Sequence, residues 1–254
     1  MNRIKKIFEK RSKKVIPYFT AGYPHKEDTL GMVLAAETAG AAMVELGIPF
    51  SDPLADGPVI QDSSQIAIQN GVSLTWIFDT VSEIRKRSEI PIALMGYINP
   101  ILKFGLSVFI SECKVSGVDG LIIPDLPPEE ADDFLKMSEE NGISPILLVA
   151  PNTTDIRIQQ ISKLAGDLIY CVSILGVTGS SGSTNDDLKT YLERVEKYSS
   201  CPYIVGFGIR NRSDVINVNK MSHGAVVGSE LIREVGKSTD PIECVNKFIE
   251  RFVS

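Results

Sequence analysis

The chain has 254 residues, of which 43% are hydrophobic, so it can bury a large core, and its length fits one large α/β domain or two ordinary ones. Its 26 basic and 32 acidic residues give a formal net charge of −6, which provides no basic surface for nucleic acid and favours a small molecule or another protein as the partner. The four cysteines are widely spaced and no apolar run approaches the ~20 residues that cross a bilayer, so we expect a soluble, cytoplasmic protein without a disulfide framework, zinc site or membrane segment.

An amphipathic pattern opens the chain. Ile4, Ile7 and Phe8 recur at helical spacing among charged residues. The pattern predicts a short extra helix at the N-terminus that plugs or caps the fold.

Eight short segments rich in apolar and β-branched residues follow, and each precedes a helical pattern. These segments are apolar enough to be buried on both faces, as in a parallel sheet. The predicted strands start near Val15, Ala42, Pro91, Val118, Ser144, Asp167, Pro202 and Gly224. The predicted helices cover 26–39, 74–87, 106–115, 128–141, 155–164, 186–198, 213–219 and 242–252. The longest connections without predicted structure follow the second and sixth strands.

Eight β-then-α units in a chain close to the usual ~250 residues predict an α/β fold of the (β/α)₈ TIM-barrel class. The alternative, a doubly wound sheet, usually carries a G-x-G-x-x-G pattern after its first strand, and that pattern is missing. No linker or shift of composition divides the chain. We therefore expect a single barrel domain over residues 1–254.

The stretch from Glu45 to Pro58 places an acid in an apolar strand and ends in a loop rich in proline and glycine. Glu45 shares strand parity with Met43, so both side chains should point to the same face. If that face lines the barrel mouth, burial would favour the protonated carboxyl and make Glu45 a proton donor and acceptor near neutral pH. The alternative is a buried acid that is paired with a neighbouring donor.

Asp56 lies eleven positions further on, in the loop. We expect this carboxylate to be partly solvated and ionised, which suits a hydrogen-bond acceptor or a base. Two carboxylates in unlike environments can supply an acid and a base to one substrate. The alternatives are a solvated loop aspartate or an Asx turn, and Asp52 and Asp62 compete for the same role.

Glycines gather after three successive predicted strands, at the place where a barrel often binds phosphate. They occur in residues 176–179, in residues 206–208 and at Gly228, which precedes Ser229 and a short helical run. Glycine lets backbone N–H groups approach an anion closely, and a helix N-terminus adds a favourable dipole. The set predicts a phosphate site, with ordinary tight turns as the alternative.

Other residue types restrict the chemistry. His25 and His223 have no metal-ligand spacing, and His223 falls at the start of the eighth strand, so we interpret both as structural or exposed. No predicted strand ends in lysine, so a Schiff-base mechanism lacks its nucleophile. The aromatic residues Trp76, Tyr97 and Phe104 are interpreted as packing residues.

The segment from Glu45 to Pro58 closely resembles the signature of the tryptophan synthase alpha chain family. Residues 170–179, with their Gly-Val-Thr-Gly sequence, residues 206–209 and the Gly228-Ser229 pair are similar to that family too, in the same order along almost the whole chain.

The resemblance implies a (β/α)₈ barrel that cleaves indole-3-glycerol phosphate to indole and glyceraldehyde 3-phosphate by acid/base-assisted retro-aldol cleavage. Such an enzyme is a carbon–carbon lyase of tryptophan biosynthesis. By resemblance, Glu45 would protonate the indole carbon C3 and take the proton from the glycerol hydroxyl. Asp56 would accept a hydrogen bond from the indole N–H.

The resemblance also implies the residues that bind the substrate. Tyr170 would border the two carboxylates. The phosphate would be held through backbone N–H groups and a hydroxyl by Gly179, Gly208, Gly228 and Ser229. The indole ring would lie near Leu126, Phe207 and Tyr18. Tyr18 departs from the phenylalanine common in the family, and Ile174 falls where arginine is often found.

A partner is implied as well: a beta chain that contains pyridoxal phosphate and joins indole to serine, in a heterotetramer of two alpha and two beta chains. No cofactor would bind this chain itself. The segments expected to communicate with the partner are a lid at 174–187 and loops at 49–61 and 99–104.

Two rival functions stay open at this point. One is another phosphosugar barrel, such as an isomerase or an indole-glycerol-phosphate synthase, although the latter needs lysines at strand ends. The other is a barrel without chemistry that only regulates a beta-like subunit.

Overall fold

The computed structural model describes residues 2–9, 11–172, 185–206, 208–209 and 211–253. Over these residues nine parallel strands form one sheet in the order β5-β4-β3-β2-β1-β9-β8-β7-β6. The strands are β1 (Val15–Thr20), β2 (Val44–Gly47), β3 (Ile92–Met95), β4 (Gly120–Ile122), β5 (Ser144–Pro145), β6 (Leu147–Val149), β7 (Ile169–Val172), β8 (Tyr203–Gly206) and β9 (Ala225–Val227).

The two ends of this sheet belong to one continuous segment. β5 pairs with β4 and β6 pairs with β7, yet only Ile146 separates β5 from β6. The Ile146 N–H donates to the Leu121 carbonyl at 2.8 Å, so the segment keeps its pairing where it bends. Residues 144–149 therefore act as one strand that closes the sheet. The predicted eight-stranded TIM barrel is confirmed.

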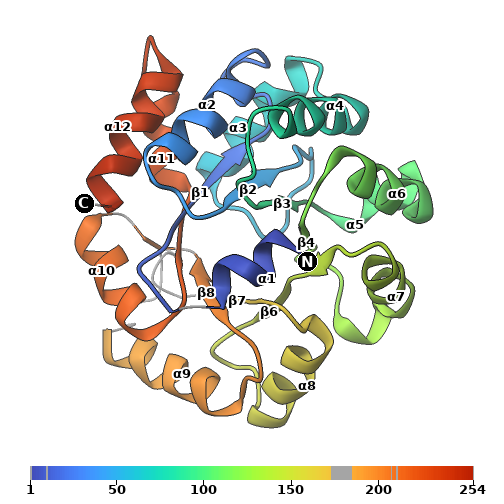
Figure 1. Ribbon diagram of the computed structural model, residues 1–254, viewed down its shortest axis with the longest axis vertical. Coiled ribbons are helices and arrows are strands. Elements are labelled where there is room, and N and C mark those ends of the chain that lie inside the picture. The colour runs from blue at the N-terminus through green and yellow to red at the C-terminus, as the bar shows by residue number, and fades with distance from the viewer. Residues whose placement is uncertain (1, 10, 173–184, 207, 210, 254) are drawn as a thin grey trace.

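Helices surround the barrel on the outside, except for the N-terminal one, which lies across one end (Figure 1). They are α1 (Arg3–Phe8), α2 (Asp28–Thr38), α3 (Pro58–Gln69), α4 (Leu74–Arg85), α5 (Ile98–Phe104), α6 (Leu106–Ser116), α7 (Asp132–Glu140), α8 (Asp155–Ala165), α9 (Asn185–Tyr198), α10 (Arg212–Met221), α11 (Ser229–Val235) and α12 (Pro241–Val253), with a 3-10 helix, η1 (Pro128–Glu130). The predicted helices are present with ends shifted by a few residues. The one predicted from Pro128 is divided into η1 and α7.

Alternation along the strands separates two apolar clusters, because successive side chains of a strand point to opposite faces. Met43, the residue before β2, belongs to the cluster inside the barrel, with Ala93 and Ile204. Val44 and Leu46 belong to the larger cluster between the sheet and the helices. The odd-numbered positions of this segment thus face the barrel interior.

Helix α1 lies across one end of the barrel, as Figure 1 shows in dark blue. Ile4 and Phe8 are buried and belong to the interior cluster. The Asn2 side chain accepts a hydrogen bond from the Ile4 N–H and so caps the helix. The predicted N-terminal plug is confirmed.

Two helices occur where the sequence predicts loops. Helix α3 begins directly after the proline and glycine loop, with Pro58 as its first residue. It was missed because its buried face includes small side chains, Ser63, Ser64 and Ala67, which give a weak apolar pattern. Helix α5 was missed because it is short and buries only Ile101, so it shows no repeated apolar pattern. The connection predicted to be structureless after the second strand is therefore partly helical.

No helix in the described ranges is long and apolar enough to cross a membrane.

At the plugged end of the barrel, a buried carboxylate connects several elements through hydrogen bonds. Asp119, at 4% side-chain exposure, accepts from Arg85 Nη2 at 2.7 Å, from the Ile92 N–H at 2.9 Å and from Arg3 Nη1 at 3.1 Å. Its backbone carbonyl accepts from the Asn2 side chain at 2.7 Å. One aspartate thus links β3, β4, α4 and the N-terminal plug.

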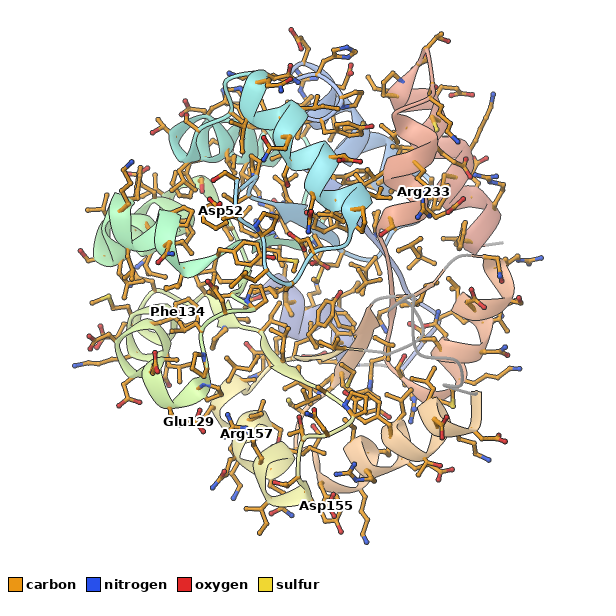
Figure 2. The ribbon with its side chains drawn as sticks, turned by 180° about the vertical axis from the view of Figure 1, so that it is seen from behind. Asp52, Glu129, Phe134, Asp155, Arg157 and Arg233 are labelled. Atoms are coloured by element: carbon orange, nitrogen blue, oxygen red, sulfur yellow. The ribbon has the colours of Figure 1, made fainter. Side chains whose placement is uncertain are left out.

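We predict that Asp119→Ala lowers the free energy of unfolding by about 3–5 kcal/mol, because it leaves the Arg85 guanidinium, whose side chain is 10% exposed, without the carboxylate that balances its charge. Urea denaturation checks this value. A matched control is Glu129→Gln, which breaks a surface ion pair with Arg157 between η1 and α8 (Figure 2). The control should lower the free energy of unfolding far less, since exposed ion pairs contribute little to stability. Equal losses in the two variants would contradict the prediction.

Candidate active site

Glu45 lies in β2 and is 1% exposed. In the sheet it stands beside Tyr18 of β1 and Ala93 of β3, and both of these belong to the interior cluster. The predicted parity with Met43 is confirmed, because Met43 also belongs to that cluster. The Glu45 carboxyl is therefore directed into the barrel.

The Glu45 carboxyl has an unusual environment. Its Oε2 is buried and has no hydrogen-bond partner among the residues that the structure describes. Burial, and secondarily the charge of Asp56, raises the pKa of Glu45 to about 8. An isolated carboxyl is more stable uncharged when water is removed. At neutral pH Glu45 is thus mostly protonated and can donate a proton.

Asp56 lies in the loop between β2 and α3, in the connection where Figure 2 labels Asp52. The residue is half-buried. Burial raises the pKa of Asp56, and a hydrogen bond with the Tyr97 side chain opposes this effect. Asp56 is thus partly solvated, as the loop composition predicted, and it keeps a polar partner, whereas Glu45 Oε2 has none among the described residues. The two carboxyl groups therefore lie in unlike environments.

Tyr97, at the end of β3, was interpreted from the sequence as a packing residue. Its ring does pack on Phe50, with 5.3 Å between centroids. Its hydroxyl also accepts from the Ala55 N–H at 3.0 Å and bonds the Asp56 carboxyl. The available signal was a tyrosine at the carboxyl end of a strand, since a buried phenol usually finds a polar partner. The structure thus adds Tyr97 to the site.

Two further tyrosines reach the interior beside Glu45. Tyr18 and Tyr170 are 8% and 4% exposed, and both carboxyl groups contribute, after burial, to raising their pKa values. Each phenol occupies space that only glycine leaves open. A Cβ at Gly47 would lie 2.1 Å from Tyr18 Oη, and one at Gly206 would lie 1.7 Å from Tyr170 Oη. The charges of both carboxyl groups thus act on the Tyr170 phenol, and its place in the substrate site, which the resemblance implies, stays a prediction.

Hydrogen-bonded hydroxyl groups connect Tyr18 with helix α3. Tyr18 is hydrogen-bonded with Thr20, whose Oγ1 lies 2.6 Å from Ser63 Oγ. Ser63 in turn donates to the Ile60 carbonyl at 2.8 Å. The Tyr18 phenol therefore has a polar partner in this chain.

The residues expected to bind phosphate are described in part. Gly208 follows β8 with φ of +77°, a conformation that favours glycine. Gly228 follows β9 and is the N-cap of α11 without a side-chain cap, and Ser229 begins this helix and is exposed. β8 and β9 are paired, so these residues follow neighbouring strands. Gly179, Phe207 and Ile174 lie outside the described residues.

The remaining predicted residues are less informative. Leu126 is half-buried and packs on the outer apolar cluster, so its contact with an indole ring stays a prediction. His25 pairs with Asp28 on the surface. His223 accepts a hydrogen bond from the Tyr203 N–H at 3.3 Å and stacks edge-on against that ring, which agrees with a structural role.

We predict that Glu45 makes stability depend on pH. Below the ordinary pKa of 4.5 both folded and unfolded chains hold the proton. As pH rises toward 8 the unfolded chain loses it while the folded chain retains it, so stability falls until the folded pKa is passed. Glu45→Gln removes this dependence. Relative to the parent, its free energy of unfolding should rise by a few kcal/mol from pH 5 to pH 8, at ~1.4 kcal/mol per pKa unit.

Urea denaturation at the two pH values measures this change, and the exposed Glu83→Gln serves as the control. A difference between Glu45→Gln and the parent that stays constant with pH would contradict a raised pKa.

Comparison with known proteins gives a consistent result. The family model described as tryptophan synthase alpha chain matches residues 4–253. The tryptophan synthase alpha chain of Petrotoga mobilis is 46% identical over 99% of this chain and 97% of its own length. That of Thermoanaerobacter sp. (strain X514) is 43% identical over 100% and 98%.

Solved structures agree. Tryptophan synthase subunit alpha from Legionella pneumophila aligns with a TM-score of 0.93 and 34% identity, covering 99% of this chain and 97% of that one. A chain from the tryptophan synthase a2b2 complex of Pyrococcus furiosus aligns with a TM-score of 0.89 and 39% identity, covering 96% and 98%. This chain belongs to the tryptophan synthase alpha chain family, a family of lyases that cleave indole-3-glycerol phosphate in tryptophan biosynthesis.

Proposed function

We propose that this chain cleaves indole-3-glycerol phosphate to indole and glyceraldehyde 3-phosphate, with Glu45 and Asp56 as its catalytic residues. The observation that carries the proposal is a pair of carboxyl groups, Glu45 inside the barrel and Asp56 on the loop that follows β2. Glu45 is protonated near neutral pH and its Oε2 has no partner among the described residues, whereas Asp56 is hydrogen-bonded by a tyrosine. Such a pair can provide an acid and an acceptor to one substrate.

In the proposed reaction the Asp56 carboxylate accepts a hydrogen bond from the indole N–H and stabilises the positive charge that develops on nitrogen. Protonated Glu45 gives its proton to the indole carbon C3. The resulting Glu45 carboxylate then accepts the proton of the hydroxyl on the adjacent glycerol carbon. The C–C bond breaks as that carbon becomes the aldehyde, and the bonding electrons return to the ring. Glu45 ends protonated, as it began.

The other substrate contacts follow from the same assignment. Backbone N–H groups of Gly179, Gly208 and Gly228 and the Ser229 hydroxyl would hold the phosphate, supported by the open N-terminus of α11. The indole ring would lie near Tyr18, Leu126 and Phe207, with Tyr170 beside the two carboxyl groups.

We also propose that this chain assembles with a beta chain into a heterotetramer of two alpha and two beta chains. The support is the similarity to a chain of the Pyrococcus furiosus a2b2 complex. The loop after β2 and helix α5 carry strongly exposed apolar side chains, Leu54 at 91% and Leu102 at 56%, which suit a protein contact. Pyridoxal phosphate would belong to the beta chain. The four free cysteines agree with a reducing, cytoplasmic location.

Glu45→Gln should reduce the rate of indole release by about 10²–10⁴-fold, the usual contribution of general acid/base catalysis. Substrate affinity should change little, because the substitution keeps the shape of the side chain. Steady-state assays with indole-3-glycerol phosphate measure the rate, and calorimetry measures binding. The exposed Glu83→Gln should behave as the parent. Full activity of Glu45→Gln would reject the assignment of Glu45.

Asp56→Asn should cause a comparable loss of kcat, because an amide cannot stabilise the developing positive charge as a carboxylate does. The variant should still bind the substrate, and its circular dichroism spectrum should match the parent's. The exposed Asp52→Asn, in the same loop, is the matched control. If Asp56→Asn failed to bind substrate at all, Asp56 would have a structural role instead.

A further inference from the structure

The position of Asp56 depends on contacts that cross three neighbouring strand ends. We infer that Asp125, in the turn after β4, is a positioning residue for Asp56 and acts through the N-terminus of α5 and Tyr97. The inference rests on the proposed role of Asp56 in the reaction and adds a residue that the sequence did not single out.

The first step is the contact between Tyr97 and the loop after β2. The Tyr97 hydroxyl accepts from the Ala55 N–H at 3.0 Å and bonds the side chain of the next residue, Asp56. Tyr97 is buried, and its ring packs on Phe50 in the same loop. A single phenol therefore fixes both the backbone and the carboxyl of the segment that carries Asp56.

The second step is the start of α5. Tyr97 is its N-cap and makes no side-chain capping bond, because a phenol ring cannot fold back onto the first turn. Pro100, in the same turn, has no N–H to satisfy. The Ile98 N–H donates instead to Asp125 Oδ1, at 3.0 Å. A carboxylate at this place also matches the positive end of the helix dipole.

The third step is the order of the strands. β2, β3 and β4 are adjacent in the sheet, so their carboxyl ends lie side by side. Asp125 follows β4, Tyr97 follows β3 and Asp56 follows β2. Asp125 thus holds the start of α5, which follows Tyr97, and Tyr97 in turn holds the loop of Asp56. These contacts link the carboxyl ends of β4, β3 and β2 in that order. Without Asp125, the start of α5 and the Tyr97 backbone lose their anchor, and Asp56 loses its fixed orientation.

Kinetics provide the first test. Asp125→Ala should lower kcat for indole release roughly 10-fold to 10²-fold, the effect of a small misplacement of a catalytic group, with little change in KM. Asp125→Asn keeps an oxygen that can accept the Ile98 N–H and should restore kcat to within a few-fold of the parent. Asp133→Ala, an exposed aspartate of α7, is the matched control. An Asp125→Asn variant as slow as Asp125→Ala would overturn the role.

A double-mutant cycle tests the route through Tyr97. Tyr97→Phe removes the hydroxyl and so breaks the chain at its middle. If Asp125 acts through this hydroxyl, the variant with both substitutions should be no slower than Tyr97→Phe alone. Losses that multiply in the double variant would show that Asp125 acts by another path and would overturn the inference.

An activity-independent measurement separates this inference from the proposed function. Amide NMR of the full chain reports the Ala55 N–H directly. Asp125→Ala and Tyr97→Phe should both shift the Ala55 resonance and speed its hydrogen exchange, while Asp133→Ala should not. A parent chain that released no indole, alone or with a beta chain, would reject the proposed function. An Ala55 resonance unchanged in Asp125→Ala would reject the inference, whatever the activity.

Discussion

The burial of the Glu45 carboxyl is the constraint on which the rest of the site depends. An acid that is 1% exposed, with one oxygen that no described residue bonds, is costly to fold. The folded chain limits that cost by keeping the group protonated, because burial raises its pKa to about 8. The closed barrel makes this possible, because mostly hydrophobic side chains fill its interior and exclude water. The same burial that reduces stability at neutral pH gives the group a proton to transfer.

Asp56 needs different surroundings, and the loop provides them. A carboxylate that stabilises positive charge must stay ionised, so it needs a hydrogen-bond donor and some solvent. Tyr97 provides the donor, and the half-buried loop provides the partial exposure. The two groups therefore lie in unlike surroundings because of their positions, Glu45 on a strand and Asp56 on a loop held by neighbouring strand ends.

The two ends of the barrel use buried carboxylates in opposite ways. Asp119, at the plugged end, is bonded by two arginines and a backbone N–H and joins β3, β4, α4 and the N-terminal residues. Glu45, in contrast, has an oxygen that no described residue satisfies. Full pairing makes the first group structural, and incomplete pairing leaves the second available to a substrate. This division agrees with barrels in general, in which one end is stabilising and the other carries the chemistry.

The sequence by itself determined the features that depend on local pattern: the repeated β-then-α order, the N-terminal plug, the shared face of Glu45 and Met43 and the presence of a second carboxylate in a proline and glycine loop. These features follow from periodicity and composition, which can be read from short segments of the sequence. Only the tertiary structure decided the closure of the sheet at Ile146 and the role of Tyr97. Its hydroxyl and the Ala55 N–H are 42 residues apart, and Asp125 and Ile98 are 27 apart. Such contacts form because parallel strands bring distant loops to one rim, and no local pattern records which side chains then meet.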